Sequence, residues 1–353
     1  MHNNETGSDE PTRLADIIVP MFYGQTGWSK RLRIGGRADL IAGADAQDDC
    51  AVFAIDGPME LVVGSDYVRR PGFQLYEQGY LSNYDIAYYL AMANFSDIAA
   101  MGALPIALLT VVRYPRSLPD EDFTALMEGI RDACRQVGAP NVGGDIGSAE
   151  RIILSASAVG IVERGGSLLR TGARPGDRLC VTGPTGIAAS AQRYFAGPTT
   201  SVKLPPAKED LLLSAWRRPQ ALVEQGRCLS TSGVVTSCQD TSDGLKAGVQ
   251  SLAAASRVGF VVEESALPVA PIVAEVAQIT KADRTSVILG DSVDFQLVFT
   301  VTEQGAPRLA KFFADAGLQF SDIGYATEEP DVRLRREDGQ EEELPGVPWR
   351  HAI

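Results

Sequence analysis

The first half of the chain alternates between short apolar runs and longer runs with a helical period. Because side chains alternate across a strand and recur every 3.6 residues around a helix, these patterns distinguish the two kinds of element. They predict strands at 51–55, 60–64, 104–114 and 152–162, helices at 81–103 and 119–137, and loops at 67–79 and 143–145. The resulting order, β-β-α-β-α-β, is typical of an α+β domain with one sheet.

A second unit follows a segment dense in turn residues, Arg170 to Asp177. Beyond it the pattern predicts strands at 178–182, 259–263 and 294–301, helices at 187–195, 206–229, 245–257 and 307–316, and an exposed, charged hairpin at 331–344. We therefore expect an α+β protein in three parts. They are an N-terminal extension at 1–40, a first domain at 41–167 and an α/β domain at 168–353.

Composition is that of an ordinary globular protein and restricts its partners. The 353 residues are 45% hydrophobic and 22% charged, and the chain is long enough for two domains with their own cores. The formal net charge of -13 argues against nucleic acid or an anionic membrane as the main partner, because affinity for a polyanion comes from Lys and Arg. A small polyanion such as ATP is compatible with this charge if Mg²⁺ bridges the like charges.

The lack of targeting signals and the placement of Cys and His narrow the choice further. No apolar run reaches about 18 residues and the polar start lacks a signal-peptide pattern, so we expect a cytoplasmic protein. The five cysteines are scattered without a Cys-x-x-Cys pair, which is typical of reduced, buried thiols. The two histidines, His2 and His351, lie near the ends, which argues against a His-ligated zinc site and a Ser-His-Asp triad.

Asp97 is the most informative residue, because it lies within the small-residue helix predicted at 81–103. Residues such as Ala99 and Gly102 let other backbone approach this helix closely. A buried carboxylate there is costly unless it is paired, hydrogen-bonded or bound to a metal ion. The pattern therefore favours a site at Asp97, with a purely structural role as the alternative.

Further carboxylates fall at the ends of strand-like runs, beside Gly, Ser or Thr: Asp48, Asp49, Asp66, Asp145, Asp240 and Asp243. Each is also typical of an ordinary feature, such as a solvated turn, a strand end or a helix N-cap. Together they supply the oxygen ligands that Mg²⁺ prefers, and such ions commonly hold phosphates. The set therefore favours a Mg²⁺-nucleotide site.

Two segments add features that suit phosphate. In Gly143-Gly144-Asp145 the glycines would let backbone N–H groups approach phosphate while the carboxylate holds metal. In Asp240-Thr241-Ser242-Asp243-Gly244 two carboxylates and two hydroxyls fall at a predicted helix N-terminus, which favours anions. Arg170, before a Gly-rich turn, is either a phosphate clamp or a surface residue.

Six motifs follow one another in a distinctive order. They are Asp-Asp-Cys-Ala-Val (48–52), Ser-Asp (65–66), Asn-Phe-Ser-Asp-Ile-Ala-Ala-Met-Gly-Ala (94–103), Gly-Gly-Asp (143–145), Leu-x-Arg-x-Gly-Ala-x-Pro-Gly-Asp (168–177) and Asp-x-Ser-Asp-Gly-Leu (240–245). This order resembles the thiamine-monophosphate kinase family, which belongs with aminoimidazole ribonucleotide synthetase, selenophosphate synthetase and the hydrogenase-maturation dehydratase. The resemblance extends from about residue 45 to the C-terminus.

The resemblance implies a ferredoxin-like N-terminal α/β domain that forms a homodimer through its sheet. It also implies a C-terminal α/β domain of the aminoimidazole ribonucleotide synthetase type, with ATP and Mg²⁺ as cofactors. The implied Mg²⁺ ligands are Asp49, Ser65, Asp66, Asp97, Asp145, Asp240 and Asp243. The implied nucleotide contacts are Gly144, Asp145, Arg170 and Ser242, and the implied catalytic residues are Asp97, Asp145, Arg170 and Asp243.

The acceptor side departs from the family pattern. Family members carry a His in the loop that corresponds to 67–73, and none is present here. The family's Gly-Gly-Glu-Asp-Tyr-Glu-Leu becomes Asp-Ser-Val-Asp-Phe-Gln-Leu at 291–297, so Val293 replaces the Glu that contacts substrate. Trp349 corresponds to a C-terminal aromatic that stacks on the thiamine-like ring. Substrate contacts are therefore expected at Arg69, Phe73, Val293 and Trp349.

We expect an ATP- and Mg²⁺-dependent phosphotransferase of this type, acting on a small metabolite. Arg69 and Arg70 suit a phosphorylated or acidic acceptor, which need not be thiamine monophosphate. Two alternatives stay open. One is an ATP-dependent amide- or carboxamide-activating ligase or dehydratase, which would release inorganic phosphate. The other is a non-catalytic nucleotide-binding homologue.

Overall fold

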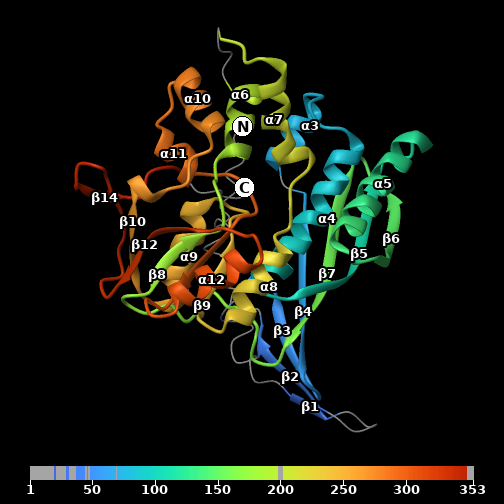
Figure 1. The fold of residues 1–353 in the computed structure, drawn as a ribbon. Helices are drawn as coiled ribbons and strands as arrows, with labels where there is room; N and C mark the ends of the chain where they lie inside the picture. Colours follow the sequence, from blue (N-terminus) through green and yellow to red (C-terminus); the bar gives the residue numbers. More distant parts are fainter. Residues whose placement is uncertain are drawn as a thin grey trace.

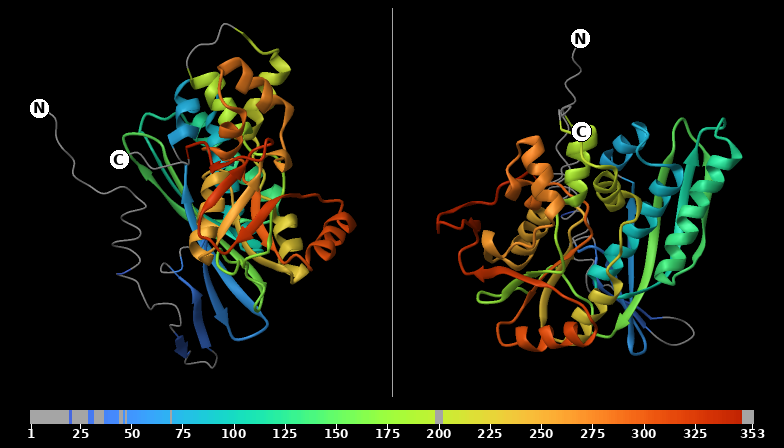
Figure 2. Two further views of the ribbon diagram at one scale, coloured as in Figure 1. Left: turned by 90° about the vertical axis from the view of Figure 1, so that its left-hand side faces the viewer. Right: turned by 45° about the horizontal axis from the view of Figure 1, so that its top comes forward.

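Two seven-stranded sheets organise the protein. The computed structural model describes residues 20, 29–31, 37–43, 46, 48–68, 70–197 and 202–347. The two sheets lie side by side with helices between and around them (Figures 1 and 2). The prediction of an α+β protein is confirmed.

The first sheet has the strand order β1-β2-β3-β4-β7-β5-β6, and only its β5–β6 pair is parallel. Its strands are β1 Ser29–Arg31, β2 Arg37–Ala42, β3 Ala51–Ile55, β4 Met59–Tyr67, β5 Leu104–Tyr114, β6 Asn141–Ser148 and β7 Ile153–Glu163. The helices of this part are α3 Arg70–Glu77, α4 Asn83–Ala100 and α5 Asp120–Val137. Helices α4 and α5 pack together and cover one face of the sheet (Figure 1).

The second sheet has the order β14-β13-β10-β12-β8-β11-β9. Its strands are β8 Arg178–Val181, β9 Val235–Asp240, β10 Gly259–Glu263, β11 Leu297–Val301, β12 Ser321–Thr327, β13 Val332–Arg335 and β14 Glu341–Glu343. Its helices are α6 Ile187–Ala196, α7 Pro206–Arg217, α8 Val223–Ser232, α9 Leu245–Ser256, the 3₁₀ helix η2 Glu264–Ala266, α10 Pro271–Thr280, α11 Arg284–Leu289 and α12 Ala306–Asp315. The hairpin predicted at 331–344 is confirmed as β13 and β14. The chain crosses between the sheets at 164–177, and we keep the domain boundary there as a proposal.

Two predicted segments are wrong in their helices. The loop predicted at 67–79 contains α3, because a proline is tolerated in the first helical turn and Leu75 is buried on its inner side. The single helix predicted at 206–229 is divided into α7 and α8. Pro219 explains the division, since the residue before a proline is disfavoured in a helix.

The predicted loop at 143–145 is instead part of β6. Gly143 and Gly144 have φ angles of 147° and 141°, which glycine adopts without strain. A Cβ atom at Gly144 would lie 1.8 Å from the carbonyl oxygen of Thr110 on β5, so the glycine is what lets the two strands pair. The sequence pattern favoured a turn because adjacent glycines usually mark one.

Helix α4 lies at the centre of the molecule and joins its two parts. It packs on β4, β5 and β7 of the first sheet and on α8 and β9 of the second part. A Cβ atom at Gly226 in α8 would lie 2.1 Å from the carbonyl oxygen of Ala99 in α4, so the two backbones touch. The predicted close packing of this helix is confirmed. Like the other described helices, α4 is not long and apolar enough to cross a membrane.

We expect Gly226→Ala to lower the free energy of unfolding by about 1–3 kcal/mol, because the added methyl group cannot fit between α8 and α4 without moving backbone. Urea denaturation would measure the change. Glu224→Ala in the same helix is the matched control, since Glu224 is exposed. Equal stability of the two variants would show that the helices can separate at little cost.

Candidate active site

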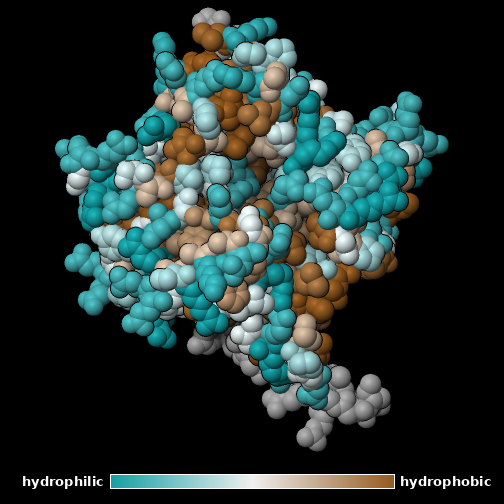
Figure 3. All heavy atoms as spheres, viewed as in Figure 1, coloured by the Kyte–Doolittle hydropathy of each residue, from teal (hydrophilic) through white to brown (hydrophobic). Residues whose placement is uncertain are grey.

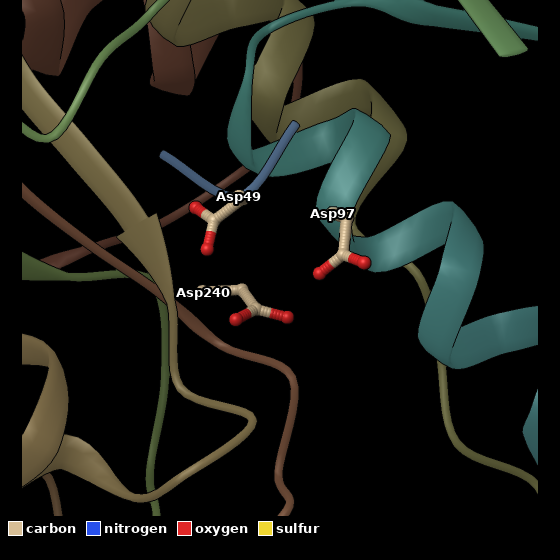
Figure 4. A group of neighbouring side chains, drawn as sticks. All are labelled: Asp49, Asp97 and Asp240. Atoms are coloured by element: carbon tan, nitrogen blue, oxygen red, sulfur yellow. The ribbon is translucent and has the colours of Figure 1, made fainter. Parts of the chain in front are cut away.

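Three carboxylates from distant parts of the chain meet beside α4. Asp49 lies just before β3, Asp97 lies in α4, and Asp240 ends β9. A carboxylate oxygen of each lies within 4.8 Å of those of the other two. Figure 4 shows the three side chains pointing toward one another. The group forms only when the two parts of the molecule pack together, because Asp240 belongs to the second sheet.

Helix α4 presents two consecutive residues to this group. Every residue from Asp85 to Ala100 is buried except Asp97, which is partly exposed. The buried hydroxyl of Ser96 donates a hydrogen bond of 2.6 Å to the Asp240 carboxylate. Ser96 thus fixes the orientation of Asp240. Ser96 has no local signal for this role, although it stands beside Asp97 in the motif at 94–103.

Asn94, one turn earlier, holds the end of β4 against the helix. Its Oδ1 accepts a hydrogen bond of 3.0 Å from the backbone N–H of Asp66, and its Nδ2 donates to the Leu90 carbonyl. Side chains alternate along β4, so Asp66 faces the helices and Ser65 faces the opposite side of the sheet. The Ser65 hydroxyl donates to the Ala156 carbonyl there. The side chains of Ser65 and Asp66 therefore do not bind the same metal ion within one chain.

A single arginine counters part of the negative charge. The Arg170 guanidinium forms an ion pair with Asp49, and its backbone N–H donates to Asp48 at 2.6 Å. Among the described residues, Arg170 Nε, Asp48 Oδ2 and Asp49 Oδ2 are buried without a hydrogen-bond partner. Buried polar atoms are nearly always satisfied in folded proteins. These atoms therefore mark a place where a ligand would complete the site.

The turn after β9 adds two more predicted residues. The Ser242 hydroxyl donates to Asp240 Oδ1 at 2.8 Å. The charge of Asp243 contributes to the raised pKa of Asp49, after burial and the charge of Asp48, so its carboxylate lies near the group. Helix α9 begins directly afterwards, at Leu245. The turn is therefore at a helix N-terminus, as the sequence predicts.

Burial and crowding disfavour the charged forms of these acids. Burial, followed by the charge of Asp49, raises the pKa of Asp240 to about 6. Burial also raises the pKa of Asp49, although Arg170 opposes this shift. A divalent cation would relieve both effects, and hard cations such as Mg²⁺ prefer carboxylate oxygens. The residues present therefore fit Mg²⁺.

Asp240→Asn is expected to stabilise the metal-free protein at pH 7.5 by about 1–3 kcal/mol. Below pH 3.8 the carboxyl group is protonated in both the folded and unfolded states, so its burial carries no pH-dependent cost. As pH rises through the folded pKa of about 6, the folded protein must bury the charge and loses stability. Denaturation in EDTA at pH 7.5 and pH 4.5 would test this. The advantage of the variant should shrink at the lower pH, and a variant less stable than wild type at pH 7.5 would contradict the argument.

Gly144 and Asp145 lie away from the three carboxylates within one chain. Strand β6 is three strands from β4, which at ~4.8 Å per spacing is roughly 14 Å. The exposed Asp145 carboxylate forms an ion pair of 2.5 Å with Arg113 on β5. Asp145 is therefore not brought together with Asp49, Asp97 and Asp240 in a single chain.

The predicted substrate residues are placed only in part. Arg69 and Trp349 lie outside the described residues, and of Phe73 only the backbone, within α3, is described. Val293 is 4% exposed and packs in the core, which leaves little of its surface for a ligand. Its neighbour Asp294 accepts hydrogen bonds from three backbone N–H groups at the start of α6. The segment 291–297 thus anchors that helix.

Comparison with known proteins covers most of the chain. Residues 47–162 match the AIR synthase related protein, N-terminal domain, and residues 174–337 match the corresponding C-terminal domain. The thiamine-monophosphate kinase of Pyrococcus horikoshii is 31% identical over 258 residues, which span 73% of this chain and 76% of the relative. The chain belongs to the thiamine-monophosphate kinase family. It is accordingly an ATP-dependent kinase with the AIR synthase-like fold.

Solved structures share this fold. AaThiL complexed with AMPPCP and TMP superposes with a TM-score of 0.73 at 24% identity, covering 86% of this chain and 91% of that one. The hydrogenase maturation protein HypE of E. coli gives a TM-score of 0.64 at 23% identity, covering 83% and 86%. At these identities the likeness concerns the fold alone. The family assignment therefore rests on the sequence relatives.

Proposed function

We propose that this member of the thiamine-monophosphate kinase family transfers a phosphoryl group from Mg²⁺-bound ATP to a small phosphorylated or acidic acceptor, which need not be thiamine monophosphate. The observation that carries the proposal is the convergence of Asp49, Asp97 and Asp240 beside Arg170, where buried polar atoms lack partners among the described residues. The likeness to a structure that holds AMPPCP and TMP supports a nucleotide at this fold.

The roles of the residues follow from their positions. Asp49, Asp97 and Asp240 would hold Mg²⁺, which when bound would neutralise charge on the phosphates. Ser96 keeps Asp240 oriented, and Arg170 provides a partly buried cation beside the same group. Such a site acts by positioning and electrostatic stabilisation. A phosphate monoester acceptor is already an anion, so no general base is required.

We also propose that two copies form a homodimer through the open sheet face. We define this face by the exposed side chains on the side of the first sheet that α4 and α5 leave uncovered: Tyr67, Leu104, Leu109, Val111 and Ile153. Figure 3 shows part of it as brown atoms at the lower right. Exposed apolar side chains gathered on one face of a sheet are typical of a protein–protein interface. A second copy covers it with identical chemistry, and because Ser65 and Asp145 lie on this face, we expect them to contribute only in the dimer.

Product analysis tests the proposed reaction. The protein is incubated with ATP, Mg²⁺ and either thiamine monophosphate or a set of phosphorylated and acidic metabolites. A kinase leaves the phosphoryl group on its product, whereas an amide-activating enzyme releases inorganic phosphate. Calorimetric titration with AMPPCP, with and without Mg²⁺, provides the direct check of the site. Uptake of AMPPCP that does not depend on Mg²⁺ would contradict the proposal.

A further inference from the structure

We infer, on the basis of the proposed kinase reaction, that the non-reacting end of the acceptor binds in a pocket between α3 and the helices α6, α10 and α11. We further infer that this end carries an anion, either a carboxylate or a phosphate. The inference concerns the class of substrate that this chain accepts. It rests on the shape of the pocket, on the charges that line it and on its contact with the turn after Asp240.

The pocket has a suitable size and place. Its volume is about 710 Å³, which falls in the range of cavities that enclose metabolite-sized ligands. Figure 1 shows the four helices grouped at the top of the molecule. The pocket lies between the two parts, because Gln74 of α3 lines it together with residues of the second part. Gln192 of α6 donates a hydrogen bond of 3.1 Å to Gln74 across this boundary.

The pocket lies next to the carboxylates described above. Gly290 lines it. A Cβ atom at Gly244 would lie 2.0 Å from the Gly290 carbonyl oxygen, so the backbone at 290 packs directly on the turn after β9. That turn begins at Asp240. The backbone at Gly290 therefore connects the wall of the pocket to the turn that carries Asp240.

The lining of the pocket is positive although the protein is strongly negative. The charged residues of the described lining are the exposed Arg193 of α6, the exposed Lys281 at the end of α10 and one carboxylate, Asp291, so its formal charge is +1 in a chain of -13. Among the described residues, neither Arg193 nor Lys281 forms an ion pair. Two cations that form no ion pair with the described part of the chain repel a cationic ligand end and attract an anionic one.

The backbone at Lys281 carries a conformational cost. Lys281 has a φ angle of 52°, a left-handed conformation that is unfavourable for a non-glycine residue. Glycine would end α10 more cheaply. A lysine there also offsets the negative end of the helix dipole, which is the alternative explanation. The two explanations differ in what they predict, because a dipole effect changes stability and leaves ligand selectivity unchanged.

Matched sugar phosphates test the inference. Three six-carbon probes carry the same phosphate but differ at the other end: 6-phosphogluconate is anionic, glucose 6-phosphate is neutral and glucosamine 6-phosphate is cationic. Each is titrated calorimetrically into wild-type protein saturated with Mg²⁺ and AMPPCP, so that the nucleotide site is filled. We expect 6-phosphogluconate to bind at least tenfold more tightly than glucosamine 6-phosphate. The double variant Arg193→Gln/Lys281→Gln should reduce this ratio to below threefold.

Arg116→Gln/Lys311→Gln is the control, because it removes two exposed cations away from the pocket and should keep the wild-type ratio. Equal affinities for the three probes, or no binding of any of them, would overturn the inference. A ratio that persists in Arg193→Gln/Lys281→Gln would overturn it as well. Failure of Mg²⁺-AMPPCP uptake would instead contradict the proposed function, and titration of the probes without nucleotide would then still report on the pocket.

Discussion

Replacing Asp97 by Asn is expected to lower the rate of phosphoryl transfer at least about 100-fold while the protein stays folded. The substitution keeps the shape of the side chain and removes its charge. Asp97 is the one partly exposed residue in an otherwise buried stretch of α4, and its carboxylate lies within 4.8 Å of those of Asp49 and Asp240. Loss of this charge weakens the hold on Mg²⁺ and thereby on the triphosphate.

The measurement is steady-state phosphoryl transfer at saturating ATP, with thermal unfolding as the check of the fold. We expect the melting temperature to stay the same or rise, because one of three crowded negative charges is gone. Asp315→Asn at the exposed end of α12 removes a charge far from the group and should leave the rate unchanged. Activity of Asp97→Asn close to that of wild type would rule out the assignment of this residue.

Charged residues on the open sheet face are expected to convert the proposed homodimer to a monomer. Leu109 and Val111 on β5 are 40% and 38% exposed, and a dimer would bury both. Glutamates at both positions would place four carboxylates at the twofold interface without partners, which costs several kcal/mol. Analytical ultracentrifugation of Leu109→Glu/Val111→Glu should therefore show a mass of 37.7 kDa, whereas wild type should show twice that value.

The same variant should also lose activity if Ser65 and Asp145 act across the interface. Leu211→Glu/Phe312→Glu is the control, because it places the same charges on exposed apolar residues of α7 and α12. This control should remain a dimer. A wild-type protein that sediments as a monomer would contradict the proposed dimer directly.

Much of the site could be predicted because its residues carry local signals. Asp97 stood out since a carboxylate among small residues of a buried helix is costly, and the structure places it beside two other acids. The turn from Asp240 to Gly244 was expected at a helix start and is found there. These features depend on spacing along the chain, which the sequence shows directly.

Other features depend on distant partners and had no local signal. The strand β6 was missed because only pairing with Thr110 of β5 distinguishes its glycines from a turn. Asp145 lies away from the other acids because β6 is three strands from β4. The Gly-Gly-Asp motif at 143–145 gives no information about this strand order. Phe295 adopts a φ angle of 50° next to Asp294, whose carboxylate binds the start of α6 about 100 residues earlier in the chain. Such contacts emerge only when the fold is complete.

Because α4 lies between the two sheets, a cation bound beside it would strengthen the association of the two parts of the molecule. Asp49 and Asp97 come before the crossing at 164–177 and Asp240 comes after it. A cation bound by all three would therefore link the two parts non-covalently. The two fragments left by proteolytic nicking within 164–177 should therefore need more urea to separate in magnesium than in chelator.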